Sequence, residues 1–319
     1  MAAKLQQIKL TPKLNFKKLL KGFELVNICS HHAADKLFLL AVTAPANYRE
    51  TKKGGIFAKL KVHKPQSFVI FLFDESDHKR FEIPKQTWNY HFVQPLPDNE
   101  LLLVCGRSAY RGSDDYDLNA QVFDFNGVLK RSFLLGDGIE DVQTTTDGCI
   151  WTSYFDEGIF GNFGWHNTQP VGLPGLILWN KFGEKLYEFS PVGSLEHMAD
   201  CYALNVTNDN EAWCYYYSQF PIVKIQNQEI KNIWETNLRG SDRFAIWENY
   251  ALFRGGYEDH DQYFLYSLEE SGEMKLQESF ELIDENNRKL EGRYRTARGP
   301  IFHICQNHKL YQIDLRNLI

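Results

Sequence analysis

A pattern of apolar strand, polar turn and apolar strand recurs along the chain at intervals of roughly fifty residues. Apolar runs such as Leu101-Leu-Leu-Val follow short turns rich in Asp, Asn and Gly, which is typical of tight hairpins. The turns of successive copies fall at Asp98-Asn99, Asp147-Gly148, Asp209-Asn210, Glu248-Asn249 and Arg298-Gly299. A fixed period of this length predicts a repeat architecture in which each copy is one structural unit.

Each copy contains a second hairpin, which brings it to four antiparallel strands. One second hairpin has Asn126-Gly127 at its tip, and this dipeptide suits a type I′ turn because both central residues need a positive φ. Four antiparallel strands per repeat form the blade of a β-propeller. We therefore predict an all-β protein, residues 1–319 forming a single β-propeller domain of six blades, or seven if residues 45–66 hold a further hairpin. The predicted blades span approximately residues 22–86, 90–135, 140–190, 199–238, 243–283 and 290–315.

The N-terminal segment is predicted to complete the last blade, which has only three strands of its own. Residues 1–21 are interpreted as a closing strand, Leu5-Gln-Gln-Ile-Lys-Leu, and a short connecting segment. Pairing this strand with the last blade would cover two edges that a sheet protein must protect. Downstream, apolar residues at near-helical spacing predict a short amphipathic helix packed on its own domain: Leu14, Phe16, Leu19, Leu20 and Phe23.

Composition agrees with a β-rich protein, since Phe, Tyr and Trp make up 14% of the chain. The six cysteines are scattered without a C-x-x-C spacing, which favours a reduced protein over a disulfide framework or a zinc site. The N-terminus lacks the apolar core of a secretory signal, and no apolar run is long enough for a transmembrane helix. We expect a cytoplasmic protein that makes no membrane contact.

Charge is unevenly distributed, although the net value is −6. A negative total argues against nucleic-acid binding by the molecule as a whole. Residues 1–64 nevertheless carry 13 Lys or Arg against three acids. This segment is either a basic patch for an anionic partner or a solvated first blade beside an acidic remainder.

The long loops are predicted to gather at one end of the blades. In an up-and-down blade, the loops between second and third strands share an end with the connections between blades. Long loops on a rigid scaffold are where binding and catalysis concentrate. The long segments predicted at this end are residues 45–66, 107–117, 155–174, 190–200 and 255–261.

Polar and aromatic side chains in these loops are the candidate ligand contacts. Loop 155–174 interleaves glycines with aromatic rings, an arrangement that places apolar surface beside a few polar groups. The alternative is an ordered loop whose aromatics plug the channel mouth or pack on a neighbouring blade. Arginines in the other loops suit bidentate binding of a carboxylate or phosphate. The candidates are Arg107, Tyr110, Arg111, Asp156, Asn162, Trp165, His166, Arg254 and Tyr257.

Acidic residues before the third blade are candidates for a divalent cation site. Asp137, Glu140 and Asp141 lie where the chain enters the innermost strand, and hard cations such as Ca²⁺ prefer carboxylate oxygens. Two equivalent positions in other repeats hold Phe92 and Ala203, so no acidic ring repeats around the blades. The acids are equally explained as turn residues. Whether the protein holds a cofactor stays open, with a divalent cation as the candidate.

Residues 135–165 resemble a group of uncharacterised bacterial propeller proteins, and the phrase from Val142 to Trp151 is similar to blades of NHL-type and sensor propellers. Senescence-marker-type lactonases share a six-bladed plan and bind a divalent cation through acids and an asparagine. Their ligand positions do not match this sequence residue by residue. The resemblance therefore implies a fold and a bacterial-type protein, without an activity.

Three function classes follow from these patterns. The leading hypothesis is a non-catalytic binding module that presents its loop-rich face to a protein or a small ligand. The first alternative is a metal-dependent hydrolase or lactonase at the channel mouth, near Asp141, Asp156 and Asn162. The second is a carbohydrate-binding protein that uses Trp165 and the tyrosines. None of the common hydrolase, nucleotide-binding or zinc-protease motifs is present in the sequence.

Overall fold

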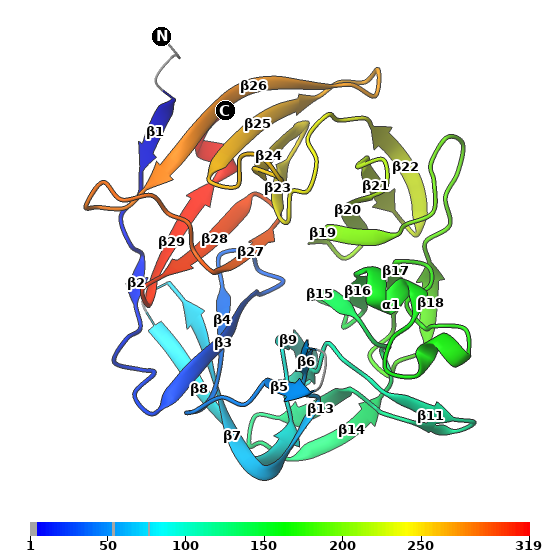
Figure 1. The fold of residues 1–319 in the computed structure, drawn as a ribbon. Helices are drawn as coiled ribbons and strands as arrows, with labels where there is room; N and C mark the ends of the chain where they lie inside the picture. Colours follow the sequence, from blue (N-terminus) through cyan, green and yellow to red (C-terminus); the bar gives the residue numbers. More distant parts are fainter. Residues whose placement is uncertain (1–4, 53–54, 76) are drawn as a thin grey trace. The chain divides into compact units, whose positions relative to one another are not determined.

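The computed structural model describes residues 5–52, 55–75 and 77–319, and strands make up most of it. Six blades are present, five with four strands and one extended by a fifth, so the prediction of an all-β, six-bladed β-propeller is confirmed (Figure 1). The chain divides into two compact units of three blades each: unit 1 runs to Leu19 and from Pro191 to Ile319, and unit 2 is Leu20–Ser190. The single domain stays a prediction.

Unit 2 contains the first three blades, each a meander of antiparallel strands. The first blade consists of β3 (Phe23–Ser30), β4 (Leu37–Thr43), β7 (Lys61–Asp74) and β8 (Asp77–Trp88). The second consists of β9 (Phe92–Leu96), β10 (Glu100–Val104), β13 (Ala120–Asp124) and β14 (Leu129–Phe133). The third consists of β15 (Ile139–Thr144), β16 (Ile150–Tyr154), β17 (Leu176–Trp179) and β18 (Lys185–Glu188).

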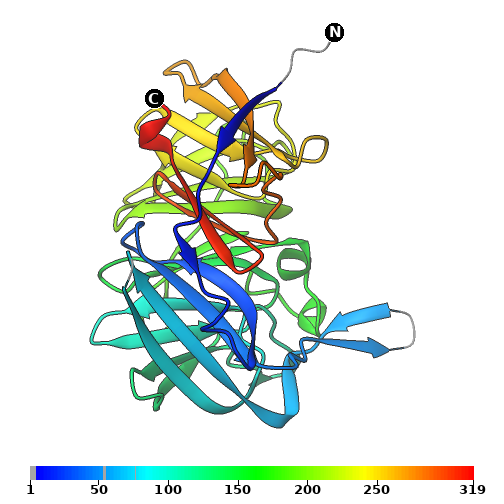
Figure 2. The ribbon, with the colours of Figure 1, turned by 90° about the vertical axis from the view of Figure 1, so that its left-hand side faces the viewer.

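The long loops of unit 2 carry small elements of their own. Loop 44–60 forms the hairpin of β5 (Arg49–Lys52) and β6 (Gly55–Ala58), which projects from the first blade (Figure 2). Because this hairpin lies between two strands of one blade, it is an insertion and adds no seventh blade. The other elements are β11 (Tyr110–Gly112) with β12 (Asp115–Tyr116), and α1 (Asp156–Phe160) with the 3₁₀ turn η1 (Trp165–Asn167).

Unit 1 contains the other three blades. The fourth consists of β19 (Asp200–Asn208), β20 (Glu211–Tyr217), β21 (Ile222–Gln226) and β22 (Glu229–Trp234). The fifth consists of β23 (Phe244–Trp247), β24 (Tyr250–Arg254), β25 (Gln262–Leu268) and β26 (Met274–Ile283). The last consists of β27 (Tyr294–Arg298), β28 (Ile301–Gln306) and β29 (Lys309–Asp314), followed by the 3₁₀ turn η2 (Leu315–Asn317).

An N-terminal strand completes the last blade as predicted, but it is a different segment from the one expected. β2 (Leu14–Asn15) pairs antiparallel with β29, whereas β1 (Gln6–Lys9) adds a parallel fifth strand to β26. The expected helix is wrong as well, because residues 17–22 form turns. Backbone groups before and after β2 bond to the last blade, and Phe16 and Leu20 are buried. These contacts fix a short strand followed by turns, so the apolar spacing of the segment reflects burial of single side chains and not one face of a helix.

The core consists of apolar side chains packed between neighbouring blades within each unit. Between the first and second blades, strand alternation directs Leu40, Ile70, Val93 and Leu101 into one cluster with aromatic neighbours. Between the fifth and last blades, a similar cluster is built around Tyr263 and its neighbours. Among the described residues no helix is long and apolar enough to cross a membrane. All six cysteines are thiols outside disulfides.

Candidate functional site

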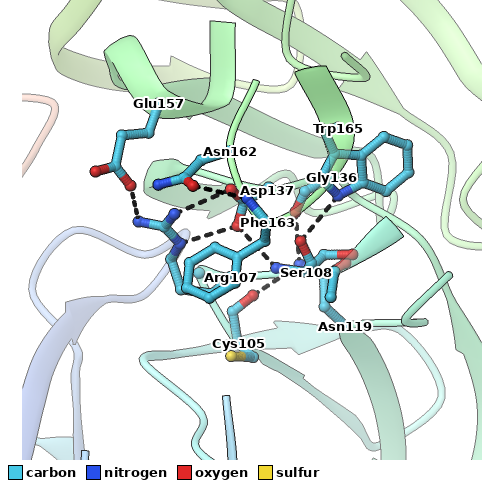
Figure 3. Close-up of polar contacts among 12 residues, drawn as sticks. Cys105, Arg107, Ser108, Asn119, Gly136, Asp137, Glu157, Asn162, Phe163 and Trp165 are labelled. Carbon is cyan, nitrogen blue, oxygen red and sulfur yellow. Dashed lines mark hydrogen bonds and ion pairs between the residues drawn. The ribbon is translucent and has the colours of Figure 1, made fainter. Parts of the chain in front are cut away.

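The site is built on the two long loops of the second and third blades and on the connection between these blades, all in unit 2 (Figure 3). Arg107 follows β10, Asp137 precedes β15, and Glu157 lies in α1. Thirty residues separate the first two in sequence, yet the blade topology brings the end of a second strand beside the start of the next innermost strand. The structure thus joins predicted ligand and metal candidates in one cluster.

Arg107 and Asp137 form a buried bidentate ion pair. Nε of Arg107 donates to Oδ1 of Asp137 at 2.9 Å, and Nη2 donates to Oδ2 at 3.0 Å. Oδ1 of Asp137 also accepts from the Ser108 backbone N–H at 2.9 Å. The third guanidinium nitrogen, Nη1, pairs with Glu157, and the ring of Phe163 lies 4.6 Å from the guanidinium carbon. The guanidinium donors of Arg107 therefore connect three chain segments: its own, the one with Asp137 and the one with Glu157.

The protonation behaviour of this cluster follows from burial. Burial raises the pKa of Asp137 to about 6, against the opposing effect of Arg107 and the Ser108 N–H, so the carboxyl is ionised at neutral pH. Burial acts the same way on Glu157, but hydrogen bonds from Asn162 and Arg107 hold the pKa of Glu157 below its ordinary value. The arrangement is one cation shared by two carboxylates.

His91 is a neighbour that the sequence patterns did not identify. Its Nδ1 accepts the Gly106 backbone N–H at 3.0 Å, just before Arg107. Burial lowers the pKa of His91 to about 4, with Arg107 acting in the same direction. His91 is therefore neutral at physiological pH and positions the chain leading to Arg107.

Trp165 and Tyr110 pack against each other inside the loop cluster. Nε1 of Trp165 donates to the Ser108 carbonyl oxygen at 2.8 Å, and the rings of Trp165 and Tyr110 lie 5.1 Å apart. Trp165 is 4% exposed. Its indole face is thus covered by the protein, which corresponds to the alternative of an ordered loop closed by its own aromatics. The sugar hypothesis would need this ring to be open to solvent.

The two loops approach so closely that glycine is required at their contact. Gly138 has φ +64°, and a Cβ there would lie 2.2 Å from the backbone nitrogen of Gly158. The Phe155 N–H donates to the Gly138 carbonyl oxygen at 3.0 Å in the same contact. The glycines of these loops therefore allow backbone to touch backbone and do not indicate mobility.

Two further polar residues, Asn119 and Asp117, fasten the first loop. Nδ2 of Asn119 donates to the carbonyl oxygens of Cys105 and Gly136 at 2.7 and 2.8 Å (Figure 3). Asp117 accepts from Lys61 at 2.7 Å and from Arg111 at 3.2 Å. An isolated Asn in a loop offers no sequence signal for such bridging, because its partners lie on other segments.

The acidic side chains predicted as metal ligands do not converge on one point. Asp137 is engaged with Arg107, whereas Asp141 accepts the Val142 N–H at 2.8 Å and the Gln143 side chain at 3.2 Å. Glu140 is half-buried at the start of β15. Within the part of the chain that the structure describes, no group of three His, Cys, Asp or Glu side chains could hold a metal ion.

Of the remaining candidates, two lie in the long loop of the third blade and two belong to unit 1. Asp156 and His166 are exposed, and Asp156 accepts only the Glu157 N–H among its described hydrogen bonds, at 2.7 Å. Arg254 and Tyr257 belong to unit 1. Arg254 pairs with Asp242, and Tyr257 is 52% exposed with its hydroxyl on that of Tyr202.

Comparison with known proteins adds little about activity. The model of the YxzG family matches residues 172–313. No curated protein matches the chain. Solved structures with a similar fold include a functionally unknown protein from Desulfotomaculum acetoxidans DSM 771. It is 13% identical in sequence, the match covers 92% of this chain and 84% of that chain, and the TM-score is 0.48.

Two further similar structures carry a lactonase name. One is a putative 6-phosphogluconolactonase from Bacteroides fragilis NCTC 9343, which is 11% identical in sequence. The match covers 81% of this chain and 84% of that chain, with a TM-score of 0.44. The other is the periplasmic gluconolactonase PpgL of Pseudomonas aeruginosa, which is 12% identical in sequence. The match covers 81% of this chain and 85% of that chain, with a TM-score of 0.40. Similarity at this level carries no inference about the activity of this chain.

Proposed function

We propose that the protein is a non-catalytic binding module that holds an apolar side chain of a protein partner between the two long loops of unit 2. The observation that carries this proposal is a hollow of about 470 Å³ lined by both loops. Tyr116 and Leu118 come from the first loop and Val171 from the second, over a floor that includes Phe133 and Trp179. Tyr116 and Leu118 are 38% and 40% exposed. Apolar anchors of this kind form the energetic centre of protein interfaces.

Buried contacts hold the loops that line this hollow to the blades. The bidentate pair of Arg107 and Asp137 and the backbone contact of Gly138 with Gly158 fix both loops to the blades. A preformed surface loses little conformational entropy on association, so more of the contact energy appears as affinity. In this proposal the buried polar cluster supports the binding surface and makes no contact with the partner.

The hydrolase alternative keeps its own test. It requires a cation near Asp141, Asp156 and Asn162, and binding to the native state alone must raise the melting temperature. A saturable rise with Ca²⁺, Mg²⁺, Mn²⁺ or Zn²⁺ that disappears in Asp141→Asn would replace the binding-module proposal. We expect no such rise, because Asp141 already accepts hydrogen bonds from Val142 and Gln143.

The test of the proposal places a charge in the hollow. Leu118→Asp should reduce the affinity for a captured protein partner by about 2 kcal/mol or more, roughly thirtyfold in Kd. The matched control is Val128→Asp, because Val128 is 55% exposed in the turn between β13 and β14, outside the loops. Both variants should melt like the wild type, since both side chains are exposed. Partners captured from a lysate of the native host are identified by mass spectrometry, and their Kd is measured by biolayer interferometry. Equal capture by the wild type and Leu118→Asp would refute the proposal.

A further inference from the structure

A second polar cluster lies in unit 1, where the fifth blade meets the last blade. Arg254 is the last residue of β24, Asp242 lies just before β23, and Arg295 is near the start of β27. Arg254 is paired across the sheet with Tyr263, and Tyr263 belongs to the apolar cluster between these two blades. Strand alternation thus places Arg254 at the end of an apolar interface, where a charge is costly without partners.

Asp242 accepts hydrogen bonds from the arginines of this cluster. Its Oδ2 accepts from Nη2 of Arg295 at 2.7 Å and from Nη1 of Arg254 at 3.2 Å. Nη1 of Arg243 donates to the Asp242 backbone carbonyl oxygen at 2.6 Å. Burial acts to raise the pKa of Asp242, but the three arginines outweigh burial and hold this pKa below its ordinary value. The carboxyl is therefore ionised at neutral pH. Three guanidinium groups therefore surround one carboxylate.

The arginines retain donors that this carboxylate does not use. Arg254 is 9% exposed, and the only side-chain hydrogen bonds it makes to the described residues run from Nη1 to Asp242. Nε of Arg295 is buried and has no hydrogen-bond partner among those residues. A guanidinium carries five N–H donors, and a buried donor without an acceptor costs about 1–3 kcal/mol. The spare donors of Arg254 and Arg295 lie beside the same carboxylate, so a further acceptor placed there would satisfy them.

We propose that Arg254 and Arg295 form a binding site for an oxyanion, the carboxylate or phosphate group of a small molecule. The anion takes the spare N–H donors of Arg254 and Arg295 beside Asp242, which remains as the internal counter-charge. Tyr263 lies across the strand pair from Arg254, and burial raises the pKa of its phenol, so the hydroxyl stays neutral. This site is separate from the hollow of unit 2.

The proposal is tested by isothermal titration of the full chain with inorganic phosphate and with malonate, at constant ionic strength set with chloride. The wild type should bind at least one of these anions saturably and melt at a higher temperature in its presence. Arg295→Gln and Arg254→Gln should each weaken this binding about tenfold or more, because each removes a charge-assisted donor. Arg288→Gln, an exposed arginine in the turn after β26, should bind like the wild type.

Asp242→Asn gives a response of opposite sign. It removes the competing carboxylate and raises the local charge by one, so the anion should bind several-fold more tightly. Binding of phosphate alone assigns a phosphate site, and binding of malonate alone assigns a carboxylate site. Absence of saturable binding of both anions by the wild type overturns the proposal, and so does an equal loss in Arg288→Gln. If the arginine variants fail to fold, Asp242→Asn decides, and unchanged or weaker binding by that variant also overturns the proposal.

Discussion

Replacing Asp137 by asparagine should destabilise unit 2 more than any change of an exposed charge. The substitution keeps the volume of the side chain but removes its negative charge. The lost charge currently faces the guanidinium of Arg107 through two parallel hydrogen bonds of 2.9 and 3.0 Å. An asparagine amide would turn an NH₂ group toward this cation, or leave the Ser108 N–H without its acceptor.

The magnitude follows from burial. Asp137 is 2% exposed and the Arg107 side chain 10%, so both charges are largely out of water. Removing one partner of a buried ion pair costs about 3–5 kcal/mol. Because Glu157 still pairs with Arg107, and because burial of the Asp137 charge is costly enough to raise its pKa to about 6, we expect a smaller loss, about 2 kcal/mol. For a cooperative unit of this size, that corresponds to a fall in melting temperature of about 4–8 °C.

Urea denaturation followed by tryptophan fluorescence measures this loss. The control is Asp115→Asn, because Asp115 also pairs with an arginine, Arg111, but its side chain is 66% exposed. Such surface pairs contribute about 0–1 kcal/mol. The double variant Arg107→Met with Asp137→Asn should cost less than the sum of its single changes, since no buried charge is left alone. An Asp137→Asn protein within about 0.5 kcal/mol of the wild type would refute the assignment of this pair as the fastening of the loops.

Two further predictions concern the same loops. Gly138→Ala should lower the free energy of unfolding by several kcal/mol, since its Cβ would lie 2.2 Å from the Gly158 nitrogen. Gly22→Ala, at φ +85° with open space around it, should cost only about 1 kcal/mol in the same thermal melts. Asp117→Asn should be destabilising at pH 7. Burial acts to raise the pKa of Asp117, but Lys61, Arg111 and the Ala109 N–H outweigh burial and hold this pKa below its ordinary value. That stability is present above the unfolded pKa of about 4 and is lost as pH falls through the folded pKa, so the two proteins should converge in acid. A gap that persists in urea melts at low pH would contradict this.

The blades could be predicted because their signals are local. Asp98 and Asn99 both have positive φ, at 65° and 59°, as the residue types of a tight hairpin turn suggest. The turn predicted at Asn126-Gly127 is also present, with φ 78° at Gly127, but Asn126 does not have a positive φ, so the expected type I′ geometry is wrong there. Such turns fix the register of the strands beside them, and four strands per repeat then follow from the spacing.

The site could be predicted only as a set of loops. Arg107 and Asp137 were both candidates, but their pairing depends on how two blades pack, and the sequence holds no local record of that. Asp242 was missed altogether, because a single Asp between Ser241 and Arg243 reads as an ordinary turn residue. Its role comes from Arg254 and Arg295, which lie 12 and 53 positions away in sequence.

The N-terminal segment shows the same limit and leads to a prediction that separates its two strands. Phe16 is fully buried, its N–H donates to the His308 carbonyl oxygen at 3.0 Å, and its ring meets that of His308. Ile8, on the strand added to β26, is only partly buried. Phe16→Ala should therefore cost about 3–5 kcal/mol, and Ile8→Ala about 1 kcal/mol, in the free energy of unfolding. Equilibrium denaturation of both variants measures the order. If Ile8→Ala were the more damaging change, the segment at residues 5–10 would stabilise the fold more than β2 and Phe16 do. Anchoring of the last blade through Phe16 would then be wrong.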